Sequence, residues 1–152
     1  MSNNDPLVSM ETSKGNIKVR IFKNDAPVTA SNFLELVGKQ FYDGLIFHRY
    51  EPNFCIQGGD PTGTGTGGSG KTIPLETKPH LKHDGAGIIA MARTNDPNSA
   101  TSQFYFTLAP CPFLDGQYAV FGKVELQVFV LKGCTEEEFA RRYRNDSRTE
   151  GE

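Results

Sequence analysis

The stretch Phe47-His48-Arg49-Tyr50-Glu51-Pro52-Asn53-Phe54-Cys55-Ile56-Gln57-Gly58-Gly59-Asp60 decides how the rest of this 152-residue sequence is interpreted. Residues 45–50 and 54–57 are two short strand-like runs separated by a turn. Because side chains alternate between the faces of a strand, the second run places Cys55 and Gln57 on one face and Ile56 on the other. One face is therefore predicted to be core and the other to point outward.

A second stretch, Ser102-Gln103-Phe104-Tyr105-Phe106-Thr107-Leu108, has the same alternation. Phe104, Phe106 and Leu108 share a face typical of core, and Gln103, Tyr105 and Thr107 share the opposite one. Two strands would then present amides and an aromatic ring on one wet face. Such a face suits a peptide groove, which needs hydrogen-bonding groups and a pocket for a ring, although it is also typical of an ordinary solvated sheet.

The other segments predict a mainly β protein with one clear helix. Residues 25–37 can form that helix, with Asp25 as its cap and Pro27 in the first turn. Its apolar stripe is Ala30, Phe33, Leu34 and Val37. Many short strands with one helix indicate a closed antiparallel barrel; further strands are predicted at residues 7–12, 17–21, 88–92, 103–108 and 119–124.

Composition narrows the class of protein further. The net charge of −2 favours neither nucleic acid nor a membrane surface as a partner. The first thirty residues are polar and mixed, which predicts a cytoplasmic protein. Cys55, Cys111 and Cys134 are odd in number and widely spaced, which is typical of reduced thiols.

Three short motif matches fail for lack of context. Residues 65–72 fit the phosphate-binding pattern GxxxxGK[ST], and residues 63–68 fit the dinucleotide pattern GxGxxG. Both need a strand before the loop and a helix after it, and Pro74 stands where that helix would continue. His80 and His83 have HxxH spacing but no third ligand nearby, so we expect solvated loop histidines and no metal.

Several separated blocks occur in order along the chain. They are the stretch from Phe47 to Asp60, the loop Gly65-Thr66-Gly67-Gly68, the pair of runs Met91-Ala92-Arg93-Thr94 and Ser99-Ala100-Thr101-Ser102-Gln103-Phe104, and the blocks Phe113-Leu114-Asp115-Gly116 and Val120-Phe121-Gly122-Lys123-Val124. Together these blocks resemble the cyclophilins. The resemblance covers residues 7–124 and implies one domain over residues 1–152. Its fold would be a closed or incompletely closed antiparallel eight-stranded barrel capped by helices, including a helix at about 26–37.

The tail after Val124 does not resemble the family and is predicted to be divergent or truncated over residues 125–152. Residues 125–131 are strand-like, and residues 136–144 are weakly helical by composition. If the strand that closes the barrel beside the first one is missing, a sheet edge stays open.

The resemblance implies a peptidyl-prolyl cis/trans isomerase that uses no cofactor. Arg49 would be the catalytic arginine, and Gln57 and Gln103 would hold the substrate backbone and help to orient Arg49. Gly65 would let its loop approach closely. The remaining implied substrate-binding residues are Phe54, Cys55, Tyr105, Phe113, Leu114 and Tyr118 at the proline pocket, and Ala92, Arg93 and Thr94 along the adjoining groove.

Partners implied by the family are proline-containing peptides and unfolded client proteins, bound by a monomer. Phe113 stands where many members carry Trp, so weak binding of cyclosporin-type ligands is expected. The alternative that the residues leave open is a non-catalytic proline-peptide binding module or chaperone on the same scaffold. Arg49 favours the enzyme, because binding alone does not need a donor at the prolyl nitrogen.

Overall fold

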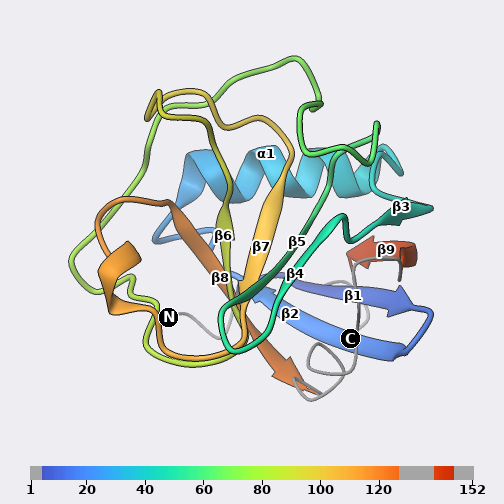
Figure 1. Cartoon of the computed structure of the whole chain (residues 1–152), viewed down its shortest axis with the longest axis horizontal. Helices are drawn as coiled ribbons and strands as arrows, with labels where there is room; N and C mark the ends of the chain where they lie inside the picture. The colour runs from blue at the N-terminus through green and yellow to red at the C-terminus, as the bar shows by residue number, and fades with distance from the viewer. Residues whose placement is uncertain (1–4, 127–138, 146–152) are drawn as a thin grey trace.

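The computed structural model describes residues 5–126 and 139–145, and within them one antiparallel sheet is covered by one α-helix (Figure 1). The helix is α1, Pro27–Gly38, and a short 3-10 helix spans Pro112–Leu114. The strands are β1 Leu7–Thr12, β2 Gly15–Ile21, β3 Leu45–Ile46, β4 Arg49–Glu51, β5 Cys55–Gly58, β6 Ile88–Met91, β7 Phe104–Thr107, β8 Val120–Leu126 and β9 Phe139–Asn145.

The sheet is strongly curled. Its two edge strands, β3 and β4, follow each other in the sequence. The strand order is β3-β9-β1-β2-β8-β6-β7-β5-β4, and only Phe47 and His48 separate β3 from β4. The run 45–50, predicted as one strand, is therefore two strands, because the chain crosses here from one end of the order to the other. The prediction of a mainly β, incompletely closed barrel is confirmed, with nine strands in the described ranges rather than eight.

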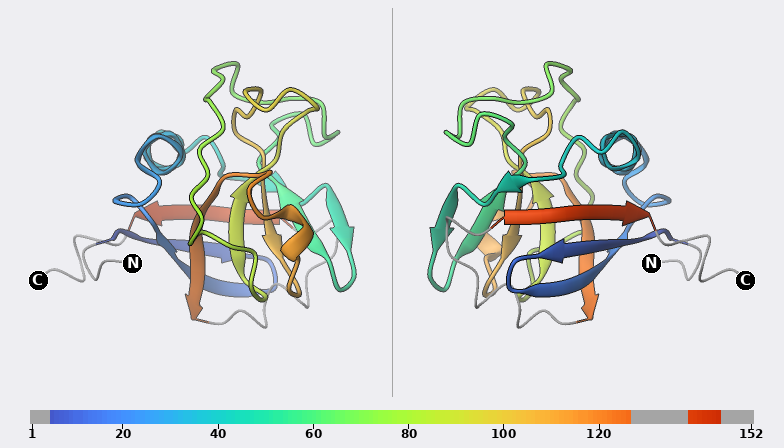
Figure 2. Two further views of the ribbon diagram at one scale, coloured as in Figure 1. Left: turned by 90° about the vertical axis from the view of Figure 1, so that its left-hand side faces the viewer. Right: turned by 90° about the vertical axis from the view of Figure 1, so that its right-hand side faces the viewer.

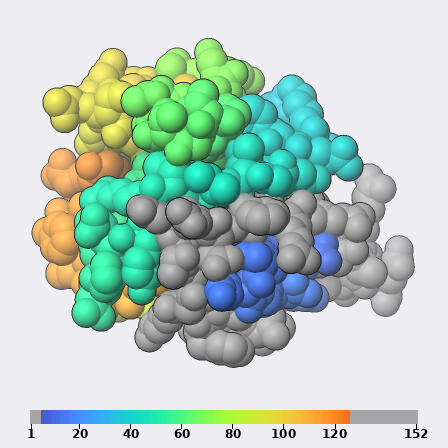
Figure 3. Space-filling view, turned by 45° about the vertical axis from the view of Figure 1, so that its right-hand side comes forward, coloured from blue at the N-terminus to red at the C-terminus, as the bar shows by residue number. Residues whose placement is uncertain are grey.

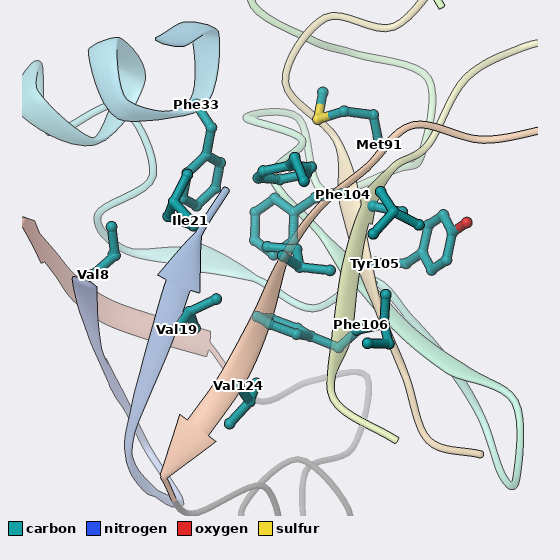
Figure 4. Packing of buried hydrophobic residues seen from close by; sticks show 14 of the residues in the cluster. Val8, Val19, Ile21, Phe33, Met91, Phe104, Tyr105, Phe106 and Val124 are labelled. Atoms are coloured by element: carbon teal, nitrogen blue, oxygen red, sulfur yellow. The ribbon is translucent and has the colours of Figure 1, made fainter. Parts of the chain in front are cut away.

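The core lies inside the curl, beneath α1. Figure 4 shows Phe104 and Phe106 pointing toward the interior, with Phe33 of α1 beside Phe104, while Tyr105 points the opposite way. The rings of Phe33 and Phe104 meet edge to face with centroids 5.6 Å apart. The alternation predicted for this strand is therefore confirmed.

Helix α1 packs against β9 and β8 and lies above β9 in Figure 2. Its buried stripe contains Ala30, Phe33 and Val37 as predicted, but Leu36 takes the place expected for Leu34, which is only partly buried. The predicted Asp25 cap is wrong.

The acceptor at the start of α1 comes from a distant loop. The Glu76 carboxylate accepts the backbone N–H groups of Val28 at 3.3 Å and Thr29 at 2.9 Å. A carboxylate at a helix N-terminus also interacts favourably with the helix dipole. Glu76 therefore both caps α1 and ties the loop after residue 70 to it.

The tail supplies a strand where a weak helix was predicted. Strand β9 pairs antiparallel with β1, from Val8 opposite Asn145 to Thr12 opposite Ala140, and also with β3. The helical prediction is wrong over Phe139–Asn145, where pairing with β1 overrides local propensity, while residues 127–138 and 146–152 lie outside the described part. Strand β1 is thus paired on both sides, with β2 and β9.

In the described ranges, no helix is long and apolar enough to cross a membrane.

Candidate active site

Only half of the outward face of β5 and β7 is exposed to solvent. Gln57 and Gln103 are partly exposed as predicted, but Cys55, Tyr105 and Thr107 are buried, so the prediction of a solvated face is wrong for these three. The Thr107 hydroxyl donates to the carbonyl of Gly85 at 2.7 Å and accepts the Ile88 N–H at 3.0 Å. Chain from outside the two strands covers this half of the face, which leaves the amide half open.

Two adjoining hollows lie along this face. The apolar pocket, of about 170 Å³, is lined by Arg49, Phe54, Cys55, Gln57, Ala92, Arg93, Tyr105, Leu114 and Tyr118. The polar pocket, of about 310 Å³, is lined by Gln57, Gly65, Thr66, Ala92, Arg93, Thr94, Ser99, Thr101 and Gln103. The structure thus brings together every predicted site residue except Phe113.

Phe113 lies at the rim instead. Its side chain is the most exposed large apolar group in the described part, at 68%, and its ring centroid is 5.8 Å from that of Phe54. Thr66, Ser99 and Thr101 are lining residues that the sequence did not reveal. Small hydroxyl residues in loops carry no periodic signal, although Ser99 and Thr101 lie in a run that resembles the family.

Arg49 and Gln57 are placed together by a short hairpin. They are opposite each other in the β4–β5 pairing, and the turn is closed by the Phe54 N–H donating to the Glu51 carbonyl at 3.0 Å. The Arg49 guanidinium carbon lies 5.6 Å from the Phe54 ring centroid, and Nε is 3.8 Å from the Glu51 carboxylate. With its side chain 47% exposed, Arg49 presents charge at the mouth of the apolar pocket.

The two glutamine amides form a directed chain. Gln57 Nε2 donates to Gln103 Oε1 at 2.9 Å, and Gln103 Nε2 donates to the carbonyls of Gly65 at 3.0 Å and Gly67 at 2.7 Å. These bonds fix which end of each amide is oxygen. Gln57, which lines both pockets, therefore has its oxygen as the amide atom that can accept a hydrogen bond.

Asp60 holds the loop that supplies those carbonyls. Its carboxylate accepts the N–H groups of Thr62, Thr64, Gly65 and Gly67 at 2.6–3.2 Å, as well as the Thr62 hydroxyl. Burial by itself raises the pKa of Asp60, but the hydrogen bonds from Thr62, Gly67 and Gly65 outweigh it and hold that pKa well below its usual value.

This loop is the one that fits the phosphate-binding pattern, and the carboxylate explains why the pattern misleads. The N–H groups that would cradle a phosphate already surround Asp60, and no helix follows Lys71 and Thr72. A side chain at Gly67 would come within 2.3 Å of the Asp60 carboxylate, so this position needs glycine. Figure 3 shows the loop, in green, against the yellow 93–101 segment at one end of the molecule.

The apolar pocket has a polar support beneath it. His83 is fully buried, so the prediction of a solvated histidine is wrong; His80 is exposed as expected. His83 Nδ1 lies 2.9 Å from the Asp115 carboxylate, and Nε2 lies 2.8 Å from the Tyr105 hydroxyl. Because the carboxylate only accepts, Nδ1 carries a proton, and in the neutral imidazole the Tyr105 hydroxyl donates to Nε2.

The acid and the phenol of this support have opposite pKa shifts. Burial raises the pKa of Tyr105 far above its usual value, which keeps it a neutral donor. Burial also raises the pKa of Asp115, but the backbone and ring N–H groups of His83 outweigh it and lower that pKa. The support is therefore a fixed chain of hydrogen bonds from Asp115 through His83 to the pocket lining.

Arg93 forms the wall shared by the two pockets. Its Nε and Nη2 donate to the Gln117 carbonyl at 3.1 and 2.8 Å, and Nη1 donates to the Thr94 carbonyl at 2.8 Å. The guanidinium carbon lies 4.6 Å from the Tyr118 ring centroid, a cation–π contact. Arg93 is thus held rigidly by neutral groups.

Two cysteines in the described part of the chain are free thiols. Cys55 and Cys111 are buried, and burial raises the pKa of both, while Cys134 lies outside the described residues. Within the described ranges, no cluster of three or more histidine, cysteine or acidic residues could hold a metal ion.

The fold and the site together define a class of protein: a mainly β domain with an arginine at the mouth of an apolar pocket and a row of amides beside it. The sequence model of the family described as "Cyclophilin type peptidyl-prolyl cis-trans isomerase/CLD" matches residues 7–146. This chain belongs to the cyclophilin-type peptidyl-prolyl cis-trans isomerase family, so the predicted enzyme class is confirmed. The matched range extends past residue 124 and includes β9.

Known proteins of high similarity agree with this assignment. The chain is 47% identical over 128 residues to peptidyl-prolyl cis-trans isomerase-like 1 of Gibberella zeae, covering 82% of this chain and 78% of that protein. It is also 47% identical to the isomerase ppi1 of Schizosaccharomyces pombe, covering 82% of each.

Solved structures agree as well. The crystal structure of a cyclophilin type isomerase from Cryptosporidium parvum superposes with a TM-score of 0.88 at 34% identity, covering 93% of this chain and 97% of that one. A second crystal structure of that protein, obtained in the presence of the dipeptide Ala-Pro, has a TM-score of 0.86 at 34% identity and covers 91% and 98%.

Proposed function

We propose that this chain accelerates rotation about X–Pro peptide bonds by stabilising the twisted transition state with Arg49 above the apolar pocket. The observation that carries the proposal is the position of the Arg49 guanidinium, 5.6 Å from the Phe54 ring centroid at the pocket mouth. A proline ring packed against Phe54, Leu114 and Tyr105 would bring its nitrogen within reach of that side chain.

The chemistry follows from the peptide bond itself. The C–N bond is planar by resonance, and rotation costs about 18–20 kcal/mol. In the twisted state resonance is lost, and the prolyl nitrogen becomes pyramidal and gains a lone pair. A donor aimed at that lone pair binds the transition state more strongly than the ground state, which is what catalysis requires. The Arg49 guanidinium is always charged and always a donor.

One hydrogen bond does not supply the whole effect. A ten-thousandfold acceleration needs about 5–6 kcal/mol, while a hydrogen bond to a charged group contributes about 1.5–3 kcal/mol. We assign the rest to positioning by the groove. The Gln57 oxygen, oriented by Gln103, would accept an N–H of the substrate backbone, and the buried lining would remove water from the proline ring.

We further propose that the natural substrates are proline-containing segments of unfolded client proteins, so that the chain assists folding as a monomer in the cytoplasm. The free thiols Cys55 and Cys111 suit a reducing compartment. Cyclosporin-type ligands should bind weakly, because Phe113 at the rim offers no N–H donor. Tight binding in a fluorescence titration would contradict this last point.

The decisive experiment compares the chain with Arg49→Ala in isomerisation of an Ala-Pro-Phe peptide. We expect kcat/KM to fall about ten- to a hundredfold, the equivalent of one charged hydrogen bond. Lys39→Ala is the control, because it removes an exposed cation at the C-cap of α1, whose ion pair is with Glu35. An inactive but folded wild-type chain that still binds the peptide would instead establish a proline-peptide binding module.

A further inference from the structure

The charges around the two pockets are unequal. Their lining residues, all in the described part of the chain, include Arg49 and Arg93 but neither aspartate nor glutamate. Arg49 has the Glu51 carboxylate 3.8 Å away, whereas Arg93 donates to the carbonyls of Gln117 and Thr94. The wall between the pockets therefore carries a cation whose contacts do not neutralise it.

Two acidic groups in the loops that line the polar pocket, Asp60 and Asp96, are hydrogen-bonded within their own loops. The Asp60 carboxylate is surrounded by the N–H groups of its own loop. The exposed Asp96 carboxylate accepts the Asn98 N–H at 2.9 Å within the 94–99 turn. Both lower the positive potential of the polar pocket somewhat, but neither occupies it.

The Arg93 guanidinium is also held in place before any ligand binds. Arginine has five N–H groups, and its bonds to Gln117 and Thr94 use one on each of its three nitrogens. One N–H on each Nη remains for a ligand. Because the Tyr118 ring and two carbonyls already fix the guanidinium, a ligand would gain these donors with little further loss of side-chain entropy.

The polar pocket beside it has the right size and polarity for a side chain. It holds about 310 Å³ and is lined on one side by hydroxyl residues, Thr66, Thr94, Ser99 and Thr101. It shares Gln57, Ala92 and Arg93 with the apolar pocket. A peptide with its proline in the apolar pocket would therefore place a neighbouring side chain in the polar pocket.

We infer that Arg93 is a specificity-determining residue that makes the site prefer X–Pro segments with an anionic side chain one or two residues before the proline. This inference rests on the proposed function, because it assumes that the apolar pocket holds proline. A carboxylate and a phosphoryl group share the required chemistry, since both accept hydrogen bonds from a guanidinium.

The test uses matched peptides that differ only in charge. At each of the two positions before proline, Glu is compared with Gln, and phosphoserine with serine, in isomerisation and in a binding titration with the full chain. We expect the anionic peptide to be preferred about two- to fivefold at one of the positions, the range for a solvent-accessible charge pair. The preference should shrink as salt screens the interaction.

Variants separate this role from general binding. Arg93→Gln should bring the ratio of anionic to neutral peptide close to one, whatever its effect on overall activity. Arg93→Lys keeps the positive charge but loses the paired donors of the planar guanidinium. It should therefore retain part of the preference for the anionic peptide. Lys23→Gln, which removes an exposed cation in the turn before α1, should leave the ratio unchanged.

The outcomes are distinguishable from failure of the proposed function. Equal kcat/KM values for anionic and neutral peptides from an active chain would overturn the inference and leave the isomerase intact. A ratio that survives Arg93→Gln would also overturn it. If the chain isomerises no peptide, the ratio of dissociation constants from the titration still decides the matter. The larger of the Glu and phosphoserine ratios identifies the preferred anion.

Discussion

Two carboxylates support the residues of the site, and they do so by different means. Asp60 is 1% exposed and collects N–H groups from the backbone of a glycine-rich loop. Asp115 is partly exposed and works through one side chain, the buried imidazole of His83, which receives the Tyr105 hydroxyl. The first organises the amides of the groove, and the second supports the lining of the apolar pocket.

The difference shows how a loop and a strand face are made rigid. Loop 61–67 forms no strand and so lacks regular backbone hydrogen bonds. The Asp60 carboxylate replaces them by accepting several backbone N–H groups at once. Tyr105 already lies in a strand, and only its hydroxyl needs a partner. The loop should therefore depend on Asp60 far more than the pocket depends on the Tyr105 hydroxyl.

The largest effect is expected from Asp60→Asn. The amide keeps one acceptor oxygen but turns an NH₂ group toward backbone donors, which leaves several N–H groups unsatisfied in a buried place. We expect a loss of about 3 kcal/mol in the free energy of unfolding, measured with urea. Catalysis should fall too, because the Gly65 and Gly67 carbonyls that orient Gln103 would shift.

Asp96→Asn is the matched control for this substitution. Asp96 is exposed and accepts the Asn98 N–H in its own turn, so its loss should cost under about 1 kcal/mol. Equal destabilisation by the two variants would mean that the Asp60 hydrogen bonds contribute nothing special to the loop.

An acid titration of stability should show the next largest effect. The native pKa of Asp60 lies below its usual value, so between the two values the unfolded chain binds the extra proton. Its contribution is therefore present above about pH 4 and is lost as the pH falls toward the native pKa. We expect a loss of about 1–2 kcal/mol on this acid limb, measured by urea unfolding at successive pH values.

Comparing variants shows which carboxyl groups cause the loss of stability at acid pH. The pKa of Asp115 is lowered as well, so Asp60→Asn and Asp115→Asn should each flatten part of the pH dependence, and Asp60→Asn should flatten more. An acid limb that keeps its full slope in Asp60→Asn would show that other carboxyl groups produce it.

Most of the strands could be predicted from local patterns in the sequence, whereas the membership of the site followed from the resemblance to the cyclophilins. The two-residue period of Phe104, Tyr105 and Phe106 indicated which side chains are core. The pairing of Arg49 with Gln57 follows from a short hairpin within one stretch.

The remaining features could not be predicted, because they depend on chain from far away in sequence. His83 is buried because Asp115 and Tyr105, 32 and 22 residues away, enclose it. Glu76 caps α1 from 48 residues beyond Val28. Strand β9 was predicted as weak helix because its composition favours helix, whereas its pairing with β1 was invisible.

The smallest effect is expected from Tyr105→Phe, which removes only the hydroxyl that meets His83. The ring still lines the apolar pocket, and the lost bond leaves the Nε2 lone pair buried and unpaired. We expect a loss of about 1 kcal/mol in unfolding free energy. A double-mutant cycle with His83→Leu isolates the pair, and a coupling near 1 kcal/mol would place the hydrogen bond at the value of an ordinary neutral one. A coupling near zero would mean that packing alone holds Tyr105, and that Asp60 is the only one of the two carboxylates whose hydrogen bonds shape the groove.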